Sequence, residues 1–420
     1  MSFLVFSAAK RNSRMVRRDA VRSRTLTRRL GSTARRAHST KRSLLLLGLA
    51  VMLAFCVLCP AYSGARFEIT PDIDRLIRSG QSAMYNCDYS DADQKFDQLI
   101  RTFPDHPSGF MYKAEVIWWK ALRDSTSKAL ESQFHRYTNE AIRRGEALVN
   151  KDASDFYAWY FLASTYGNMT RYYVTVTKSH LVAMRTGMKG RYYNLKSLAL
   201  KPDCVDCLIG TGSFNYFSGA LPPVIKPFAW MLGVQGDREE GLKQLETAAA
   251  KGEFGQTEAK TVLLGVYHSE LRYDDYRSLN KKLIEEYPAN HVFYKWLANR
   301  YIADHQYDEG IGFFSNLLGS QGHPGANVNQ EYANYEKARL QLQKKDLNNA
   351  ITSLTLAIGL GGKDKNLLAQ AHLMLGFALD LKGERSSALQ EYRSVLSLPN
   401  VEETHKQAAR FSKTRYQGRL

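Results

Sequence analysis

The chain has 420 residues, of which 44% are hydrophobic and 24% charged, so it is neither intrinsically disordered nor wholly embedded in a membrane. Its 5 cysteines and 11 prolines exclude a disulfide-built scaffold and a proline-rich chain. The formal net charge is +17, but residues 1–43 carry 13 Lys and Arg and one Asp, or +12, which leaves +5 for the rest. A net charge this small on residues 44–420 does not support nucleic-acid binding, and we predict none.

Residues 1–65 have the order of a secretory signal sequence. A basic arm ending at Lys41-Arg42 precedes an uncharged apolar run of 16 residues, Leu44 to Cys59, and then the small residues Ser63 to Ala65. A basic segment, followed by an apolar segment and then by small residues, is typical of the signal sequences of exported proteins. The run is shorter than the roughly 20 residues that span a bilayer. We therefore predict export to the periplasm or cell envelope, with cleavage near Ala65.

Two other interpretations of this segment stay open. The apolar run is only slightly short, so residues 44–59 could serve as an uncleaved membrane anchor. A mitochondrial presequence is less favoured, although the arm is rich in Arg and Ser and poor in acids. The arm also exceeds the length of ordinary signals, about 15–30 residues in all, which makes Met15 a plausible true start.

The remaining chain, residues 66–420, contains an internal repeat. Its clearest copy holds a Leu-Gly pair, an Ala and a Tyr four residues apart, and a closing Pro: Leu375-Gly376, Ala388, Tyr392 and Pro399. This copy resembles the tetratricopeptide repeat, a helix–turn–helix unit of about 34 residues. Small residues let its two helices cross closely, the aromatic ring fills the gap to the next repeat, and Pro ends the second helix.

The same frame recurs upstream along nearly the whole of this region. Further copies are marked by Ala92, Ala141, Gly190, Gly241, Leu263, Leu297 and Ala338. We predict an all-α, right-handed helical-repeat solenoid of about eight helix pairs, with insertions at 167–188 and 217–239. The second insertion contains Pro222, Pro223 and Pro227, which exclude an uninterrupted helix there.

Residues 218–267 resemble the tetratricopeptide repeat protein 39 family. The resemblance is carried by a Ser-x-Leu-Pro-Pro element and a following Gly-x-x-Gly-Asp-Arg-x-x-Gly-Leu stretch: Ser218, Leu221, Pro222 and Pro223, then Gly233, Gly236, Asp237, Arg238, Gly241 and Leu242. A weaker resemblance, to the periplasmic helical-repeat subunits of TRAP-type solute transporters, depends on export and architecture alone. It implies an accessory solute-binding role as an alternative function.

No motif in the sequence assembles a catalytic or metal site. Cys204 and Cys207 lack the second cysteine pair of a zinc ribbon and the His of a haem attachment site. We predict that they are structural, with a local disulfide or a bond from one of them to Cys87 as open alternatives. Glycines 359, 361 and 362 depart from a phosphate-binding loop, and the histidines show no zinc-hydrolase spacing. We predict no cofactor, no metal and no enzymatic activity.

Aromatic residues crowd the first half of the repeat region, where they either pack between repeats or line a groove. In the repeat frame, the first-helix face that lines the concave groove of tetratricopeptide proteins carries Tyr157, Tyr160, Tyr216 and Phe217. Lys295 and Asn299 fall on the same face and match two residues of the carboxylate clamp by which some members hold peptide C-termini. The third clamp residue is Glu336 instead of Asn, so a complete clamp is not expected.

The second insertion offers another candidate surface. Residues 224–232 place Phe228 and Trp230 in a stretch that its prolines keep from joining a neighbouring helix. The stretch either folds back over the solenoid or docks on a partner or a membrane. We therefore predict a non-enzymatic, exported scaffold that binds a protein or peptide partner, with possible membrane association.

Overall fold

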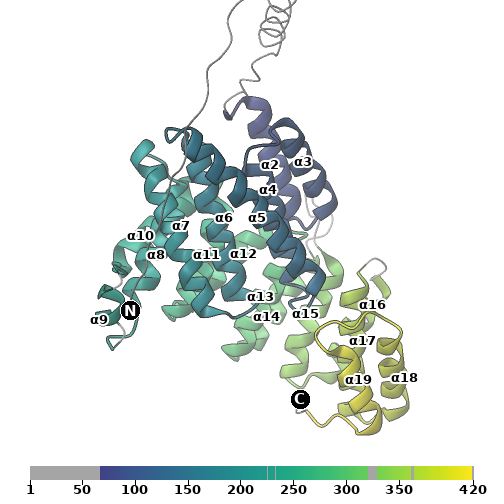
Figure 1. The fold of residues 1–420 in the computed structure, drawn as a ribbon. Helices are drawn as coiled ribbons and strands as arrows, with labels where there is room; N and C mark the ends of the chain where they lie inside the picture. The colour runs from purple at the N-terminus through teal and green to yellow at the C-terminus, as the bar shows by residue number, and fades with distance from the viewer. Residues whose placement is uncertain (1–66, 225, 232, 320–328, 361–363, 419–420) are drawn as a thin grey trace, which may run out of the picture. The chain divides into compact units, whose positions relative to one another are not determined.

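The computed structural model describes residues 67–224, 226–231, 233–319, 329–360 and 364–418, without the side chains of Phe228 and Ala229. The signal or anchor predicted at 1–65 lies outside these residues. Within them, all regular secondary structure is helical, so the all-α prediction is confirmed (Figure 1). No helix in the described ranges is both long enough and apolar enough to cross a membrane.

Apart from one short helix described below, the helices of the described residues follow one another as eight consecutive pairs and a final single helix (Figure 1). The pairs are α2 (Pro71–Tyr85) with α3 (Tyr89–Thr102), α4 (Ser108–Ala121) with α5 (Lys128–Lys151), α6 (Phe156–Thr175) with α7 (His180–Leu200), α8 (Cys207–Gly219) with α10 (Arg238–Lys251), α11 (Gln256–Ser269) with α12 (Tyr273–Glu286), α13 (His291–Ala303) with α14 (Tyr307–Gly319), α15 (Gln330–Gln343) with α16 (Leu347–Leu360), and α17 (Lys365–Lys382) with α18 (Arg385–Leu396). The last helix, α19 (Thr404–Lys413), packs on the eighth pair. This succession of helix pairs is a helical-repeat solenoid.

Glycines permit the closest crossings within pairs. A methyl group at Gly241 in α10 would overlap the Tyr216 backbone nitrogen in α8 and come within 2.7 Å of the Gly212 oxygen. In the last pair, a methyl group at Gly376 would overlap the Tyr392 ring, which is fully buried. The small residues and the aromatic ring therefore occupy the positions that the repeat pattern assigns to them.

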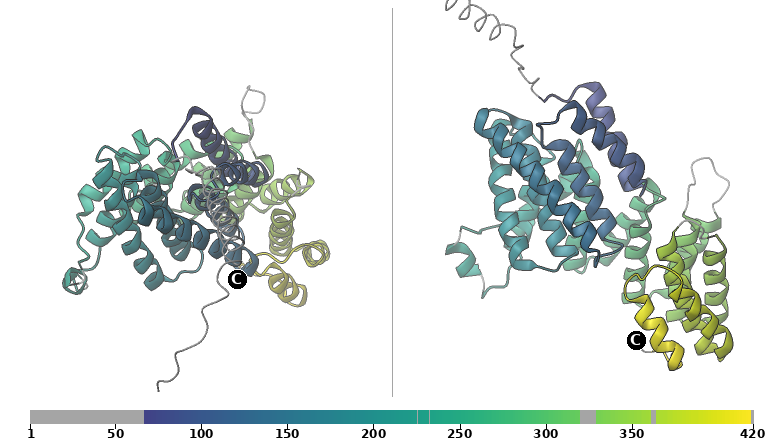
Figure 2. Two further views of the ribbon diagram at one scale, coloured as in Figure 1. Left: turned by 45° about the horizontal axis from the view of Figure 1, so that its top comes forward. Right: turned by 45° about the vertical axis from the view of Figure 1, so that its right-hand side comes forward.

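The two predicted insertions take different forms. Residues 167–188 lengthen α6 and α7 and contain the short turn between them. Residues 217–239 leave the helical frame at Gly219 and return to it at Arg238, with the six-residue helix α9 (Lys226–Met231) between. In Figure 2, α9 lies at the periphery of the helix pairs, consistent with a Trp230 side chain that is 64% exposed.

The first helices of early pairs contact the first helices of middle pairs directly. The Trp119 ring of α4 lies 5.7 Å from the Phe293 ring of α13, and Asn290 donates to the Tyr85 backbone oxygen at 2.7 Å. Nearly every residue of α4 is buried, because this helix also packs against α3, α5 and α6. Side chains therefore fill the inner surface between these helices, where the repeat pattern alone predicts an open groove.

Candidate functional site

The loop between α10 and α11 is the centre of the candidate site. Asp206, buried at the start of α8, accepts from the backbone N–H groups of Glu253, Phe254 and Gly255 at 2.8, 2.9 and 3.1 Å. Glycine is needed beside this carboxylate, because a methyl group at Gly252 would come within 2.6 Å of its Oδ1. One carboxylate therefore joins this loop to the loop that precedes α8.

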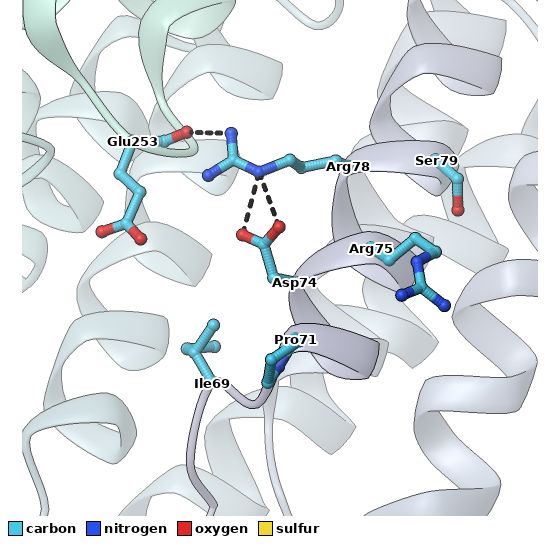
Figure 3. A pocket seen from close by; sticks show the side chains of 7 residues that line it. All are labelled: Ile69, Pro71, Asp74, Arg75, Arg78, Ser79 and Glu253. Carbon is cyan, nitrogen blue, oxygen red and sulfur yellow. Dashed lines mark hydrogen bonds and ion pairs between the residues drawn. The ribbon is translucent and has the colours of Figure 1, made fainter.

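Helix α2 holds the same loop from its other side. Arg78 donates to the Glu253 backbone oxygen at 2.8 Å, and Gln81 donates to the Phe254 oxygen at 2.8 Å. The Arg78 guanidinium also pairs with Asp74 at 2.8 Å and lies over the Phe254 ring, 4.9 Å from its centroid. Figure 3 shows this guanidinium between the Asp74 carboxylate and the Glu253 backbone oxygen.

Two hollows flank the loop, and Glu253 lines both, so we name them together the Glu253 cleft. The larger, about 750 Å³, is open to solvent and is lined by Ile69, Pro71, Asp74, Arg75, Arg78, Ser79 and Glu253 (Figure 3). The smaller, about 170 Å³, is lined by Phe156, Tyr157, Tyr160, Lys201, Asp203, Cys204, Val205, Asp206, Lys251, Glu253 and Phe254. The cleft thus combines apolar walls with charges of both signs.

An aromatic cluster at the start of α6 forms one wall of the smaller hollow. The Phe156 ring stacks on Tyr160 and meets Tyr157 edge-on, with centroids 5.8 and 5.1 Å apart. The Lys201 ammonium lies 5.5 Å from the Phe156 centroid, a cation–π contact. Burial raises the pKa of both tyrosines, so each hydroxyl remains a neutral hydrogen-bonding group at physiological pH.

Of the residues predicted to line a groove, the structure brings Tyr157 and Tyr160 together in this cleft. Tyr216 is buried in the core, where its hydroxyl donates to Glu270, whereas the adjacent Phe217 is exposed. Lys295 pairs with Glu402 at 2.8 Å, and the Asn299 side-chain oxygen accepts from Arg339 at 2.8 Å. These two residues contact the C-terminal repeats and both lie on α13, which does not line the Glu253 cleft.

The cysteines and the second insertion complete the set of predicted residues. Cys204 and Cys207 form a disulfide at the edge of the smaller hollow, with Cα atoms 5.4 Å apart, and Cys87 is a free thiol. Trp230 is exposed on α9, so it does not fold back over the helix pairs. The Phe228 side chain lies outside the described part of the structure.

Sequence reasoning missed a buried polar cluster that joins the first pairs to the later ones. The Cys87 sulfur lies 3.6 Å from His291 Nδ1, and the His291 ring stacks on Tyr332, whose hydroxyl donates to Asp364 at 2.6 Å. Burial raises the pKa of the Cys87 thiol to about 11 and lowers that of His291 to about 3. Both groups are therefore neutral at pH 7, and the imidazole does not activate the sulfur as a nucleophile.

A second buried cluster contains two carboxyl groups and one guanidinium group. Glu115 in α4 lies 3.3 Å from Arg171 in α6, and Arg171 lies 3.5 Å from Glu258 in α11. The Arg171 guanidinium stacks over Trp118 at 4.2 Å. Burial raises the pKa of Glu115 to about 7, although Arg171 opposes this shift. The cluster joins three first helices, and none of its residues lines the Glu253 cleft.

Comparison with known proteins yields likeness of fold only. Solved structures similar to this chain include a tetratricopeptide repeat protein from Parabacteroides merdae (12% identity, covering 71% of this chain and 98% of that one, TM-score 0.31), yeast Tom70 (14%, 82% and 82%, 0.36) and human IFIT1 (16%, 78% and 72%, 0.38). No protein-family model and no curated protein matches the sequence. The resemblance of residues 218–267 to the tetratricopeptide repeat protein 39 family therefore stays a prediction.

Proposed function

We propose that this protein is a non-enzymatic scaffold that binds a peptide segment of a partner protein in the Glu253 cleft. The observation that carries the proposal is the pairing of a small aromatic hollow with a larger open one beside a rigidly held loop. A hollow of about 170 Å³ suits one large side chain as an anchor, and the open hollow leaves room for the adjoining backbone.

The chemistry of the cleft favours a peptide over a free solute. Solute sites usually enclose about 300–1,000 Å³ and cover most of the ligand. The smaller hollow falls below that range, and the larger one is open to solvent. The alternative role, an accessory solute-binding subunit of a TRAP-type transporter, calls for a closed aromatic cavity and is therefore less well supported.

We further propose that the scaffold acts in the cell envelope, either exported or anchored by residues 44–59. The order of basic arm, apolar run and small residues supports this placement. The Cys204–Cys207 disulfide is a second support, because such bonds persist in oxidising compartments outside the cytosol.

Selection of displayed random peptides on the full-length chain tests the peptide-binding role. Peptides selected on the wild-type protein should share one aromatic or aliphatic anchor and bind at least about tenfold more weakly to Tyr157→Ser and Glu253→Lys variants. A matched control is Leu356→Ser, an exposed apolar side chain on α16. Failure to enrich any peptide, or equal loss with the control, would rule out the cleft as the binding site.

A further inference from the structure

Helix α7 exposes the face that a soluble helix normally buries. Its buried face is small and polar, and consists of Ala183, Thr186, Gly190, Asn194 and Ser197. Towards α6, the Thr186 and Thr170 hydroxyls are 2.9 Å apart and Gly190 allows close approach to Tyr166. Towards α8, Asn194 donates to the Cys207 backbone oxygen at 2.9 Å. The packing of α7 in the solenoid therefore depends on these small residues and on Tyr193, whose ring stacks on Tyr166, and leaves most of its other large apolar residues exposed.

Those large residues form a continuous exposed stripe, which we name the α7 stripe. It consists of Leu181, Met184, Met188, Tyr192 and Leu195. At about 3.6 residues per turn, the spacings of three and four place all five on one side of the helix over roughly 20 Å. Leu181 is 73% exposed and Tyr192 54% exposed. A contiguous apolar surface of this kind marks an interaction site.

Basic side chains border the stripe. Arg185, Lys189 and Lys196 are exposed along one flank, and Arg191 lies on the other, where it stacks over Phe214 at 4.3 Å. The wider segment is unusual in the same way, because residues 156–202 contain seven Lys or Arg and no Asp or Glu. The surface that faces outward is therefore both apolar and strongly positive.

We propose that the α7 stripe rests in the plane of a membrane that contains anionic lipids. An apolar stripe with Lys and Arg on its borders is the pattern of helices that insert one face at the lipid headgroup level, while the cationic heads reach the phosphates. A second copy of this chain is a poorer occupant, because it would bring the two basic borders together. This proposal is independent of peptide binding in the Glu253 cleft.

Site-specific lipid quenching tests the proposal on the full-length chain, with residues 1–66 retained. An environment-sensitive fluorescent amino acid is placed at Met188, and the protein is reconstituted in phosphatidylcholine vesicles containing acyl-chain quencher lipids, with or without phosphatidylglycerol. We expect a blue shift and strong quenching only when phosphatidylglycerol is present, and loss of both at high salt. The same label at Leu356, an exposed residue of α16, should stay unquenched in all vesicles.

A charge variant separates the electrostatic contribution of the α7 stripe to membrane binding from any contribution of residues 44–59. Those residues are the same in all samples. The double substitution Lys189→Glu and Lys196→Glu should reduce Met188 quenching to the level of neutral vesicles while circular dichroism remains unchanged. Absence of quenching at Met188 in anionic vesicles would overturn the proposal, as would equal quenching at Leu356. The proposal would also be overturned if the label at Met188 stayed unquenched in anionic vesicles but its fluorescence shifted to the blue when an acidic protein was added. That result would assign the stripe to a protein partner.

Discussion

Glu115 shows how a single buried carboxyl couples stability to pH. Its side chain is almost fully buried, and burial raises its pKa to about 7, well above the value of about 4.3 in an unfolded chain. Between those values the folded protein holds a proton that the unfolded chain has lost. The contribution of Glu115 to stability is therefore fully present below about pH 4.3 and is lost as the pH rises towards about 7.

We predict that Glu115→Gln removes this dependence. The free energy of unfolding of the wild type, relative to the variant, should fall by up to about 3 kcal/mol as the pH is raised from about 4.5 to about 7.5. Urea denaturation across this range measures the difference. His106 and His291, whose pKa values burial lowers to about 3, are common to both proteins, so their titration cancels. A difference that is constant with pH would show that Glu115 titrates normally.

At the scale of the element, the α8–α10 pair depends on two glycines at its crossing. Gly241→Ala would place a methyl group against the Tyr216 backbone and near the Gly212 oxygen, and backbone cannot yield as a side-chain tip can. We predict a loss of at least about 2 kcal/mol, typical of an overpacked contact. The control is Gly265→Ala in α11, where the methyl group meets open space and should stabilise by about 0.5–1 kcal/mol. Thermal unfolding of both variants measures the two changes in stability. Equal effects of the two substitutions would show that close packing is not the reason for glycine at position 241.

Helix α9 contrasts with this pair because its Trp230 side chain faces solvent. We predict that Trp230→Ser changes the free energy of unfolding by no more than about 0.5 kcal/mol, as for other exposed positions. If the residue docks on a partner, the same substitution should abolish that association. A drop in melting temperature comparable to that of a buried tryptophan would instead place Trp230 in the folded core.

At the scale of the whole molecule, local spacing predicted the helix pairs but could not predict how distant pairs meet. The Ala-x-x-x-aromatic and Leu-Gly spacings depend on neighbours a few residues away, so Ala388, Tyr392 and Gly376 pack as predicted. Tyr216 was expected in a groove, and the repeat frame gives no sign of the Glu270 carboxylate, 54 residues later, that receives its hydroxyl. Contacts between first helices of different pairs depend on the curvature of the array, which short motifs do not encode.

Only the aromatic wall of the Glu253 cleft could be predicted from the sequence, because the rest of the cleft depends on contacts between distant parts of the chain. The aromatic crowding of α6 drew attention to Tyr157 and Tyr160. The loop that completes the cleft is formed by two glycines, Glu253 and Phe254, a stretch with no recognisable motif. Its position is fixed by Asp206 and Arg78, which lie 47 and 175 residues away along the chain.

The contacts between distant pairs predict cooperative unfolding, unlike the nearly independent repeats of a simple solenoid. Trp119 is fully buried in α4 and packs on Tyr85 of α2 and on Phe293 of α13. Trp119→Ala should cost about 3–5 kcal/mol. It should increase amide hydrogen exchange in α13 as much as in α4, although three helix pairs lie between the pairs to which these two helices belong.

A variant in the last pair provides the comparison. Phe377→Ala removes a buried ring that contacts Tyr392 of α18, Phe411 of α19 and Tyr416, which follows α19. Its effect on exchange should be confined to α17, α18 and α19. Hydrogen exchange with mass spectrometry of both variants resolves the two patterns. If exchange in α13 is unchanged by Trp119→Ala, the pairs unfold as nearest neighbours, and the filled inner surface contributes little to the stability of the middle repeats.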